Sequence, residues 1–200
     1  MIDGRAWMAE HYPERVEAVA AFLAMVTEEN GRQNLVSPST LAHIWERHAL
    51  DSAQLLRFDR PDGLWMDVGT GGGFPGMVIA ILRDQPVMLV EPRARRAGFL
   101  EEAAVKLGLH HVSVVPTKVE RVSGSMAAVV SARAVANIPA LLAATSACTN
   151  RQSRWILPRG RSGRDELAAL QHSFKGVFHV EQSIVDPESA IVILDKVQAR

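Results

Sequence analysis

A glycine-rich turn between two apolar segments is the part of the sequence whose residue types and spacing most clearly suggest chemistry. The segment MDVGTGGGFPGMVIAI spans residues 66–81 and carries glycines at positions 69, 71, 72, 73 and 76. Glycine has no Cβ, so it permits positive φ and lets another group approach the backbone closely. Pro75 suits the first turn of a helix, where its missing N–H is no loss. A strand, a glycine turn and a helix N-terminus together predict a site whose free N–H groups face a ligand.

The glycines fit two patterns of ligand site. Gly71, Gly73 and Gly76 satisfy G-x-G-x-x-G, the fingerprint of NAD and FAD sites. Asp67 followed by Gly69, Gly71 and Gly73 satisfies D-x-G-x-G-x-G, the pattern of Rossmann-like methyltransferases that bind S-adenosylmethionine. The first pattern predicts an NAD-dependent oxidoreductase, and the second predicts a methyltransferase.

Three further features bear on this choice. Asp67 ends a strand, where its carboxylate can hold the glycine loop and, through the loop or a water molecule, the amino group of the methyl donor. S-adenosylmethionine has no pyrophosphate and needs no open helix N-terminus, and Pro75 occupies that first turn here. Both features favour the methyl donor. Glu91 ends the next apolar strand, where it can accept hydrogen bonds from both hydroxyls of a ribose, so it predicts a nucleoside ligand of either kind.

Alternating strands and helices must position these residues. From residue 63 onward, five short apolar runs predict strands at LWMDV, VMLVE, VSVVP, AAVVSA and RWILP. Helical patterns lie between them at about 75–83, 93–108, 137–148 and 163–172, and GVFHVEQSIV and SAIVILDKV predict a terminal strand pair. This alternation predicts an α/β fold with a doubly wound, mostly parallel sheet, whose ligands bind at the carboxyl ends of the strands.

Two helical patterns precede the predicted sheet. The first covers YPERVEAVAAFLAMVTEEN, with Gly31 as its stop. The second covers SPSTLAHIWERHALDSAQLLRF, with Ser37 or Ser39 as its N-cap. His48 lies on the apolar stripe of this second helix, with Asp51 three residues on and within reach. We expect a buried, hydrogen-bonded histidine, with an RNA contact as the alternative.

Composition limits the classes of protein. With 200 residues, 48% of them hydrophobic, the chain can form one domain with an extension, here divided into an N-terminal helical extension at 1–60 and a ligand-binding domain at 61–200. It has no apolar run of about 18 residues and no apolar signal core, so we expect a cytoplasmic protein without a membrane span. The single cysteine, Cys148, excludes an internal disulfide and a cysteine-based metal cluster, and we expect no metal.

The basic residues are mostly arginines and they are clustered. Of 22 basic residues, 18 are arginine, although the net charge is zero. Arginine presents a planar fork that suits phosphate and also stacks on bases. One group follows the second predicted strand and another follows the fifth: Arg93, Arg95 and Arg96, then Arg159, Arg161 and Arg164. On a parallel sheet both groups project from the edge that holds the ligand, which predicts a basic rim suited to an RNA backbone.

Four segments together resemble a known family. They are NLVSPSTLAHIWERHALDS, DVGTGGGFPG, RAGFLEEAAVKLGL and SARAVA, within a resemblance from about Asn34 to Gly160. The family is the bacterial small-subunit rRNA guanine-N7 methyltransferase RsmG, once called glucose-inhibited division protein B. The resemblance implies a Rossmann-like class I methyltransferase that uses S-adenosylmethionine to methylate N7 of a guanine in the decoding-region stem-loop of 16S rRNA. It also implies 16S rRNA or the small ribosomal subunit as the partner.

The resemblance implies particular site residues as well. Gly69 and Phe74 match positions that contact the donor, Val119 and Glu120 match a pair beside the adenine, and Arg133 matches an arginine at the site. This chain departs from the family at three positions, where it has Ala128 for an aspartate, Ala132 for a serine and Arg159 for a lysine. The last substitution keeps a positive charge, whereas the first two put fine contacts in doubt, though not the fold.

The implied reaction needs no acid–base pair. Guanine N7 carries a lone pair and no proton, so we assign no catalytic residue and expect a positioning mechanism. The alternative, an oxidoreductase, would need a hydride-transfer set such as a tyrosine–lysine pair, and the only tyrosine is Tyr12.

Overall fold

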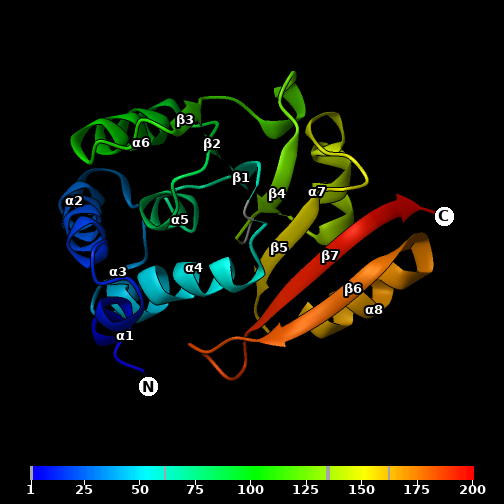
Figure 1. Cartoon of the computed structure of the whole chain (residues 1–200), viewed down its shortest axis with the longest axis horizontal. Coiled ribbons are helices and arrows are strands. Elements are labelled where there is room, and N and C mark those ends of the chain that lie inside the picture. Colours follow the sequence, from blue (N-terminus) through cyan, green and yellow to red (C-terminus); the bar gives the residue numbers. More distant parts are fainter. Residues whose placement is uncertain (1, 61, 134–135, 162) are drawn as a thin grey trace.

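A seven-stranded sheet runs through the molecule in the order β3-β2-β1-β4-β5-β7-β6 (Figure 1). The computed structural model describes residues 2–60, 62–133, 136–161 and 163–200; residues 134 and 135 of the SARAVA segment, and residue 61 at the expected domain boundary, lie outside these ranges. The strands are β1 Leu64–Val68, β2 Val87–Val90, β3 Val112–Val115, β4 Ala127–Ser131, β5 Arg154–Arg159, β6 Phe174–Gln182 and β7 Ala190–Ala199.

The first five strands are parallel, and the last two form an antiparallel pair at one edge. β1 pairs with β2 on one side and with β4 on the other, so the order of the strands reverses at β1. β7 runs antiparallel to both β5 and β6. The doubly wound, mostly parallel sheet and the terminal strand pair predicted from the sequence are confirmed. In such sheets the point of reversal is where a ligand crevice opens at the carboxyl ends of the strands.

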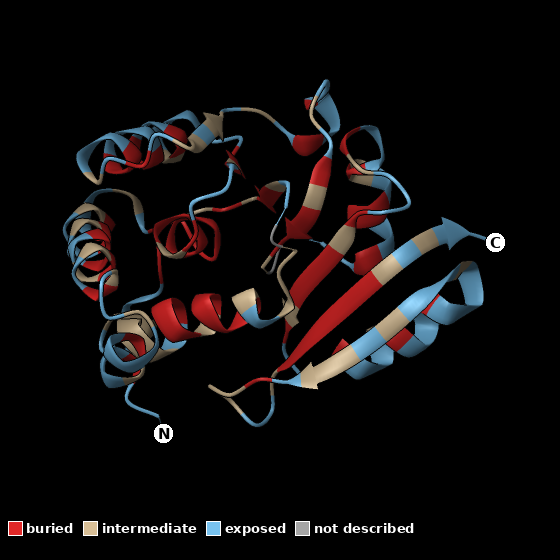
Figure 2. Cartoon of the chain, in the orientation of Figure 1, coloured by how far each residue is buried: buried red, intermediate tan, exposed pale blue. Residues whose placement is uncertain are grey.

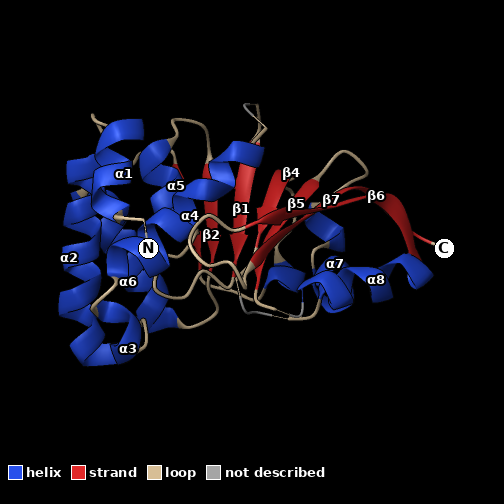
Figure 3. Ribbon diagram, turned by 90° about the horizontal axis from the view of Figure 1, so that it is seen from below, coloured by secondary structure: helices blue, strands red, loops and turns tan. Residues whose placement is uncertain are grey.

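Helices cover both faces of the sheet (Figures 1 and 3). α5 and α6 lie with the N-terminal helices on one face, and α7 and α8 lie on the other. The helices are α1 Gly4–His11, α2 Val16–Gln33, α3 Pro38–Leu41, α4 Asp51–Ala53, α5 Gly76–Leu82, α6 Ala94–Lys106, α7 Ile138–Ala144 and α8 Gly163–Ser173. A π-helical turn at Trp45–Leu50 and short 3₁₀ turns at Gln54–Phe58, Val119–Arg121 and Ser146–Cys148 complete them.

Side chains of the central strands alternate between two apolar clusters. Trp65 and Ile156 belong to the cluster beneath α5 and the N-terminal helices, whereas Met66 and Leu157 belong to the cluster beneath α7 and α8. This alternation follows from the two-residue period of a strand whose two faces are both covered. Figure 2 shows burial concentrated in α5 and the central strands, with exposed residues on the outer sides of α2, α6 and α8.

The N-terminal extension differs from the expectation in its helix boundaries. The sequence analysis missed α1, whose start is marked by Asp3: its carboxylate accepts a hydrogen bond from the N–H of Ala6 at 3.0 Å. The predicted stop at Gly31 is wrong, because α2 continues to Gln33 and ends at Asn34 in the left-handed region, with φ +47°. Asparagine tolerates this conformation, so it ends the helix as glycine would.

The second expected helix is not continuous. Ser37 precedes α3 in extended conformation, as an N-cap residue does, but the chain then passes through the π-helical turn before α4. Other parts of the protein contact this turn closely: a Cβ on Gly4 would lie 2.7 Å from the carbonyl carbon of Trp45. The N–H of Gly4 also donates to the Glu46 carboxylate at 3.1 Å. Such tertiary contacts override the simple helical period.

The extension also contacts the loop between β6 and β7. Arg47 forms an ion pair with Asp186 at 3.1 Å. The side-chain amide of Gln54 donates to the Ser183 hydroxyl at 3.1 Å, and its oxygen accepts from the N–H of Ile184 at 3.0 Å. Segments about 130 residues apart in the chain therefore meet beside the carboxyl end of the sheet.

We expect the change Gly76→Ala to destabilise the protein by about 1–3 kcal/mol, because overpacking a close contact has this cost. A Cβ at Gly76 would lie 2.3 Å from Leu89 Cδ2 and 2.7 Å from Asp67 Oδ2. The matched control is Gly98→Ala in α6, where nothing lies within 4 Å of the new Cβ, and helix propensity predicts a gain of up to about 1 kcal/mol. Urea unfolding measures both changes, and equal stability of the two variants would contradict the packing argument.

Candidate functional site

The glycine turn leaves the carboxyl end of β1 in the conformation that its composition predicts. Gly69, Gly71 and Gly73 have φ angles of +66°, +59° and +95°. A side chain at Gly73 would be excluded by packing too, since its Cβ would lie 2.6 Å from Phe22 Cζ. α5 begins directly after this turn, at Gly76, with Pro75 preceding it. At Gly69 and Gly71 the turn therefore presents backbone, with no side chain of its own, at the carboxyl end of β1.

Asp67 holds this turn from below. One carboxylate oxygen accepts a hydrogen bond from the N–H of Gly76 at 2.9 Å, and the other accepts one from the Ser131 hydroxyl at 2.6 Å. Trp65 Nε1 donates to the same hydroxyl at 2.8 Å. Asp67 thus joins β1, β4 and the start of α5, and it is fully buried. Both carboxylate oxygens of Asp67 bond to protein groups, so Asp67 can affect a bound ligand only by positioning the glycine turn.

Glu91 holds the turn from the side. Its carboxylate accepts one hydrogen bond from the N–H of Gly71 and one from the N–H of Arg93, both at 2.9 Å. The residue is 3% exposed and follows the last residue of β2. An ionised carboxylate has about four acceptor positions, so two remain for ligand hydroxyls. The position agrees with the ribose-binding role predicted for Glu91, which stays a prediction.

A pocket of about 300 Å³ opens beside the turn, at the carboxyl ends of β1, β2 and β3. It brings together three of the predicted donor residues, Gly69, Val119 and Glu120. Its other lining residues combine apolar walls with polar groups at the mouth: Val68, Val90, Pro92, Thr117, Lys118, Ala136, Ala140, Leu141 and Ala144. Apolar walls with few polar groups suit a flat heterocycle such as adenine.

Phe74 and Arg133 do not line this pocket. Phe74 is buried, with its ring centroid 5.4 Å from that of Phe22 and 4.8 Å from that of His48. The Arg133 guanidinium lies over the Phe74 ring, 5.6 Å from its centroid. Arg133 lines two neighbouring cavities, of about 470 and 180 Å³. The predicted donor contacts of these two residues remain predictions.

The larger cavity adjoins the donor-side pocket, since both are lined by Ala136. It contains Asp51, which the sequence analysis considered only as a partner of His48, and four polar or charged residues that it did not select: Asn137, Glu166, Ser183 and Ser189. Asn137 follows β4 closely, so its position in the chain could have indicated it. Ser183 and Ser189 had no such signal, because they come from the loop between β6 and β7.

The predicted contact between His48 and Asp51 is replaced by a shared partner. His48 Nδ1 lies 3.0 Å from Arg133 Nη2, and its Nε2 lies 2.9 Å from Thr40 Oγ1. Asp51 forms an ion pair with Arg133 at 3.7 Å. The expectation of a buried, hydrogen-bonded histidine is confirmed. Burial, with the charges of Arg133 and Arg47, lowers the pKa of His48 to about 3, so the imidazole is neutral at physiological pH.

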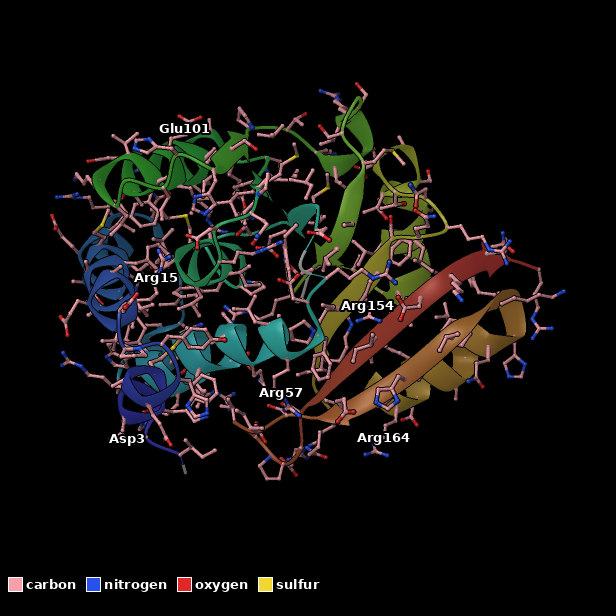
Figure 4. The ribbon with its side chains drawn as sticks, viewed as in Figure 1. Asp3, Arg15, Arg57, Glu101, Arg154 and Arg164 are labelled. Carbon is pink, nitrogen blue, oxygen red and sulfur yellow. The ribbon has the colours of Figure 1, made fainter. Side chains whose placement is uncertain are left out.

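Five of the six predicted rim arginines are accessible. Arg93, Arg95, Arg161 and Arg164 are exposed and Arg96 is half-buried; Arg164 is labelled in Figure 4. Arg161 forms an ion pair with Glu188.

The placement of Arg159 on an exposed rim is wrong. It is buried, donates to the carbonyls of Ala132 and Ala136 at 3.2 and 3.3 Å, and forms an ion pair with Glu166 at 3.4 Å. Burial lowers its pKa, although the Glu166 carboxylate opposes this change. Arg159 therefore supports the backbone after β4 from within the larger cavity.

Among the described residues, none of the helices has both the length and the apolar character that crossing a membrane requires. Within the same ranges, no three histidine, cysteine or acidic side chains gather in a way that could hold a metal ion.

Burial raises the pKa of the Asp67 carboxyl from its ordinary 3.8 to about 6, against the hydrogen bond from Ser131. Because the pKa of the Asp67 carboxyl is raised in the folded state, the folded protein binds the carboxyl proton more tightly than the unfolded chain does. The contribution of Asp67 to the free energy of unfolding therefore falls as pH rises from about 4 to 6. Above that interval the contribution is constant. We expect Ser131→Ala to raise the pKa further, since it removes a donor to the ionised form. Carbon-13 titration of the carboxyl measures this change.

The control for this titration is Ser113→Ala, which changes an exposed serine on β3. An unchanged or lowered Asp67 pKa in Ser131→Ala would contradict the assignment.

Comparison with known proteins connects this geometry to a family. The model of the family described as rRNA small subunit methyltransferase G matches residues 15–192. Ribosomal RNA small subunit methyltransferase G of Sphingopyxis alaskensis is 42% identical over 194 residues, which cover 94% of this chain and 83% of that protein. The protein of the same name from Novosphingobium aromaticivorans is 40% identical, over 96% of this chain and 86% of that protein.

Solved structures show the same fold at low sequence identity. A ribosomal protein L11 methylase from Lactobacillus delbrueckii gives a TM-score of 0.58 at 16% identity and covers 74% of this chain and 76% of its own. TYW2 of M. jannaschii, in complex with AdoMet, gives 0.59 at 14% identity and covers 84% and 80%. These matches confirm the predicted class I methyltransferase fold. The family match bears out the prediction of S-adenosylmethionine as cofactor. Neither finding supports the NAD-dependent oxidoreductase. From the extent of the family match, we conclude that the chain belongs to the rRNA small subunit methyltransferase G family.

Proposed function

We propose that this protein transfers the methyl group of S-adenosylmethionine to N7 of a guanine in the decoding-region stem-loop of 16S rRNA. The observation that carries the proposal is the pocket beside the glycine turn, which adjoins a second, polar cavity at Ala136. Two adjoining cavities suit a transfer between two bound molecules. The family match supports rRNA as the substrate.

The donor fits the first pocket by the chemistry of its lining. We assign the adenine to the apolar walls beside Val119 and Leu141. Glu91 does not line the pocket but lies between the lining residues Val90 and Pro92, and we assign the ribose hydroxyls to its carboxylate. The methionine part then passes the backbone of Gly69 and Gly71, where no side chains intervene. This path brings the sulfonium toward the larger cavity.

The reaction is a direct displacement. The lone pair of N7 attacks the methyl carbon, the carbon–nitrogen bond forms, and the carbon–sulfur bond breaks with its electron pair going to sulfur. Positive charge passes from the sulfonium to the base, so no proton has to be removed before the bond forms. The protein contributes alignment of nitrogen, carbon and sulfur, an effect of proximity and orientation. The cation of Arg133 would not stabilise a positively charged product, so we assign it to positioning.

The RNA backbone is assigned to the exposed arginines that follow β2 and β5. Arg93 and Arg95 follow β2, and Arg161 and Arg164 follow β5, so both pairs come after carboxyl ends of parallel strands. Phosphate contacts of this kind position the RNA without reading its sequence. We place the reaction in the cytoplasm, on 16S rRNA or the small ribosomal subunit.

The function is tested by incubating the protein with small ribosomal subunits, or with 16S rRNA, and S-adenosylmethionine. We expect nucleoside mass spectrometry to detect 7-methylguanosine in the decoding-region stem-loop. In a separate calorimetric titration with S-adenosylmethionine, Glu91→Ala should lose donor affinity about tenfold or more, because one hydrogen bond to a charged group contributes roughly 1.5–3 kcal/mol. Glu101→Ala, on the exposed face of α6, is the control (Figure 4). Absence of 7-methylguanosine with both substrates would refute the proposal.

Replacing Arg161 and Arg164 by alanine should weaken RNA binding and reduce the salt dependence by about one unit of log–log slope per lost phosphate contact. We expect the same loss of RNA binding and of salt slope when Arg93 and Arg95 are replaced by alanine. Donor affinity should stay within about twofold, because these side chains lie outside the donor pocket. RNA titrations at several salt concentrations measure the slope.

The control for these titrations removes two exposed arginines near the amino ends of the strands. Arg151 precedes β5, and Arg200 follows β7, which runs antiparallel to β5 and therefore ends beside the amino end of that strand. An equal loss of slope in this control pair would mean that the basic rim has no special role.

A further inference from the structure

Arg133 is held by side chains of the N-terminal extension. Its Nη2 lies 3.0 Å from His48 Nδ1, and its Nη1 lies 3.3 Å from the carbonyl oxygen of Arg47 and 3.7 Å from Asp51 Oδ2. All three partners come from residues 47–51, whereas Arg133 follows β4. The guanidinium also rests on the Phe74 ring of the glycine turn. One side chain therefore connects the extension, the sheet and the turn.

The direction of the hydrogen bonds determines the protonation of His48. Arginine can only donate, so Nδ1 of His48 must be the acceptor and its proton must sit on Nε2. Nε2 then donates to Thr40 Oγ1 at 2.9 Å, and the Thr40 hydroxyl donates to the carbonyl of Ser37 at 2.9 Å. The result is a relay in which every bond has one donor and one acceptor, from Arg133 through His48 and Thr40 to the backbone at Ser37.

The relay leaves part of the guanidinium free for a ligand. A guanidinium has five N–H donors, and the three contacts with His48, Arg47 and Asp51 engage at most three of them. The remaining donors belong to a side chain that lines both the 470 Å³ cavity and its 180 Å³ neighbour. The Arg133 guanidinium is thus held by the extension on one side and keeps free donors on the cavity side. Such a group is suited to orienting a substrate, because fixing its rotamer before binding removes an entropy cost of binding.

We propose that His48 and Thr40 are positioning residues for methyl transfer, which act by fixing the Arg133 guanidinium against the nucleotide in the larger cavity. This proposal rests on the proposed function. It assigns a role to the N-terminal extension beyond packing: the short segment from Ser37 to Asp51 sets the direction of one side chain at the site. A misplacement of about 1 Å at a remote position can cost as much as 100-fold in rate.

The test compares Thr40→Val with Thr40→Ser. Valine removes the acceptor for His48 Nε2–H while keeping nearly the same shape, and serine keeps the hydroxyl. We expect kcat for 16S rRNA methylation to fall about tenfold or more in Thr40→Val, and this fall to exceed any change in the Kd for S-adenosylmethionine. Thr40→Ser should restore kcat to within about twofold. Thr27→Val is the control, since the exposed Thr27 side chain lies on α2 and donates to the carbonyl of Leu23 at 2.8 Å, outside the relay.

Nitrogen-15 NMR of His48 tests the relay in the unaltered protein, without RNA or donor. We expect a proton on Nε2 and none on Nδ1 at neutral pH. A proton on Nδ1 would overturn the proposal, and so would parental kcat in a folded Thr40→Val protein. A loss of donor affinity with unchanged kcat would overturn it as well, because the relay would then serve the donor. Absence of methylation by the unaltered protein would refute the proposed function instead, and the tautomer measurement would still decide on the relay.

Discussion

The buried carboxylate of Asp67 is the constraint on which the rest of the site depends. It accepts hydrogen bonds from the start of α5 and from β4, so it joins the glycine turn to the two strands where the sheet reverses. A charge in this position is costly, which is why its pKa is raised. The hydrogen bonds from Ser131 and from the N–H of Gly76 offset part of that cost. Glu91 adds a second bond to the same turn from the end of β2.

Local patterns were sufficient to predict the parallel sheet and the conformation of the glycine turn. The strands β1 to β5 are short apolar runs bounded by turns, and Asp67, Gly69, Gly71 and Glu91 all lie at or just after strand ends. Their meeting follows from topology, since carboxyl ends of parallel strands share one edge. The positive φ angles of the glycines at this edge were also predictable from the sequence, because glycine has no Cβ and adopts positive φ more easily than other residues.

Long-range contacts were not predictable in the same way. Arg159 looked like a surface arginine, but the carbonyls of Ala132 and Ala136 and the carboxylate of Glu166 hold it inside. The break in the second helix depends on Gly4, and the partner of His48 comes from residue 133. None of these contacts has a periodic signature, because each depends on where separate elements dock.

The contact between the extension and the loop joining β6 and β7 has a consequence for biosynthesis. Ribosomes release a chain from its N-terminus, and the donor pocket is lined entirely by residues 68–144. The neighbouring cavity also needs Ser183, Ser189 and Ile191, which are synthesised after all of those residues. A nascent chain can therefore assemble the place for the small molecule well before the place for the nucleotide. Catalytic competence toward the ribosome's own RNA then arises only after the loop between β6 and β7 has been synthesised.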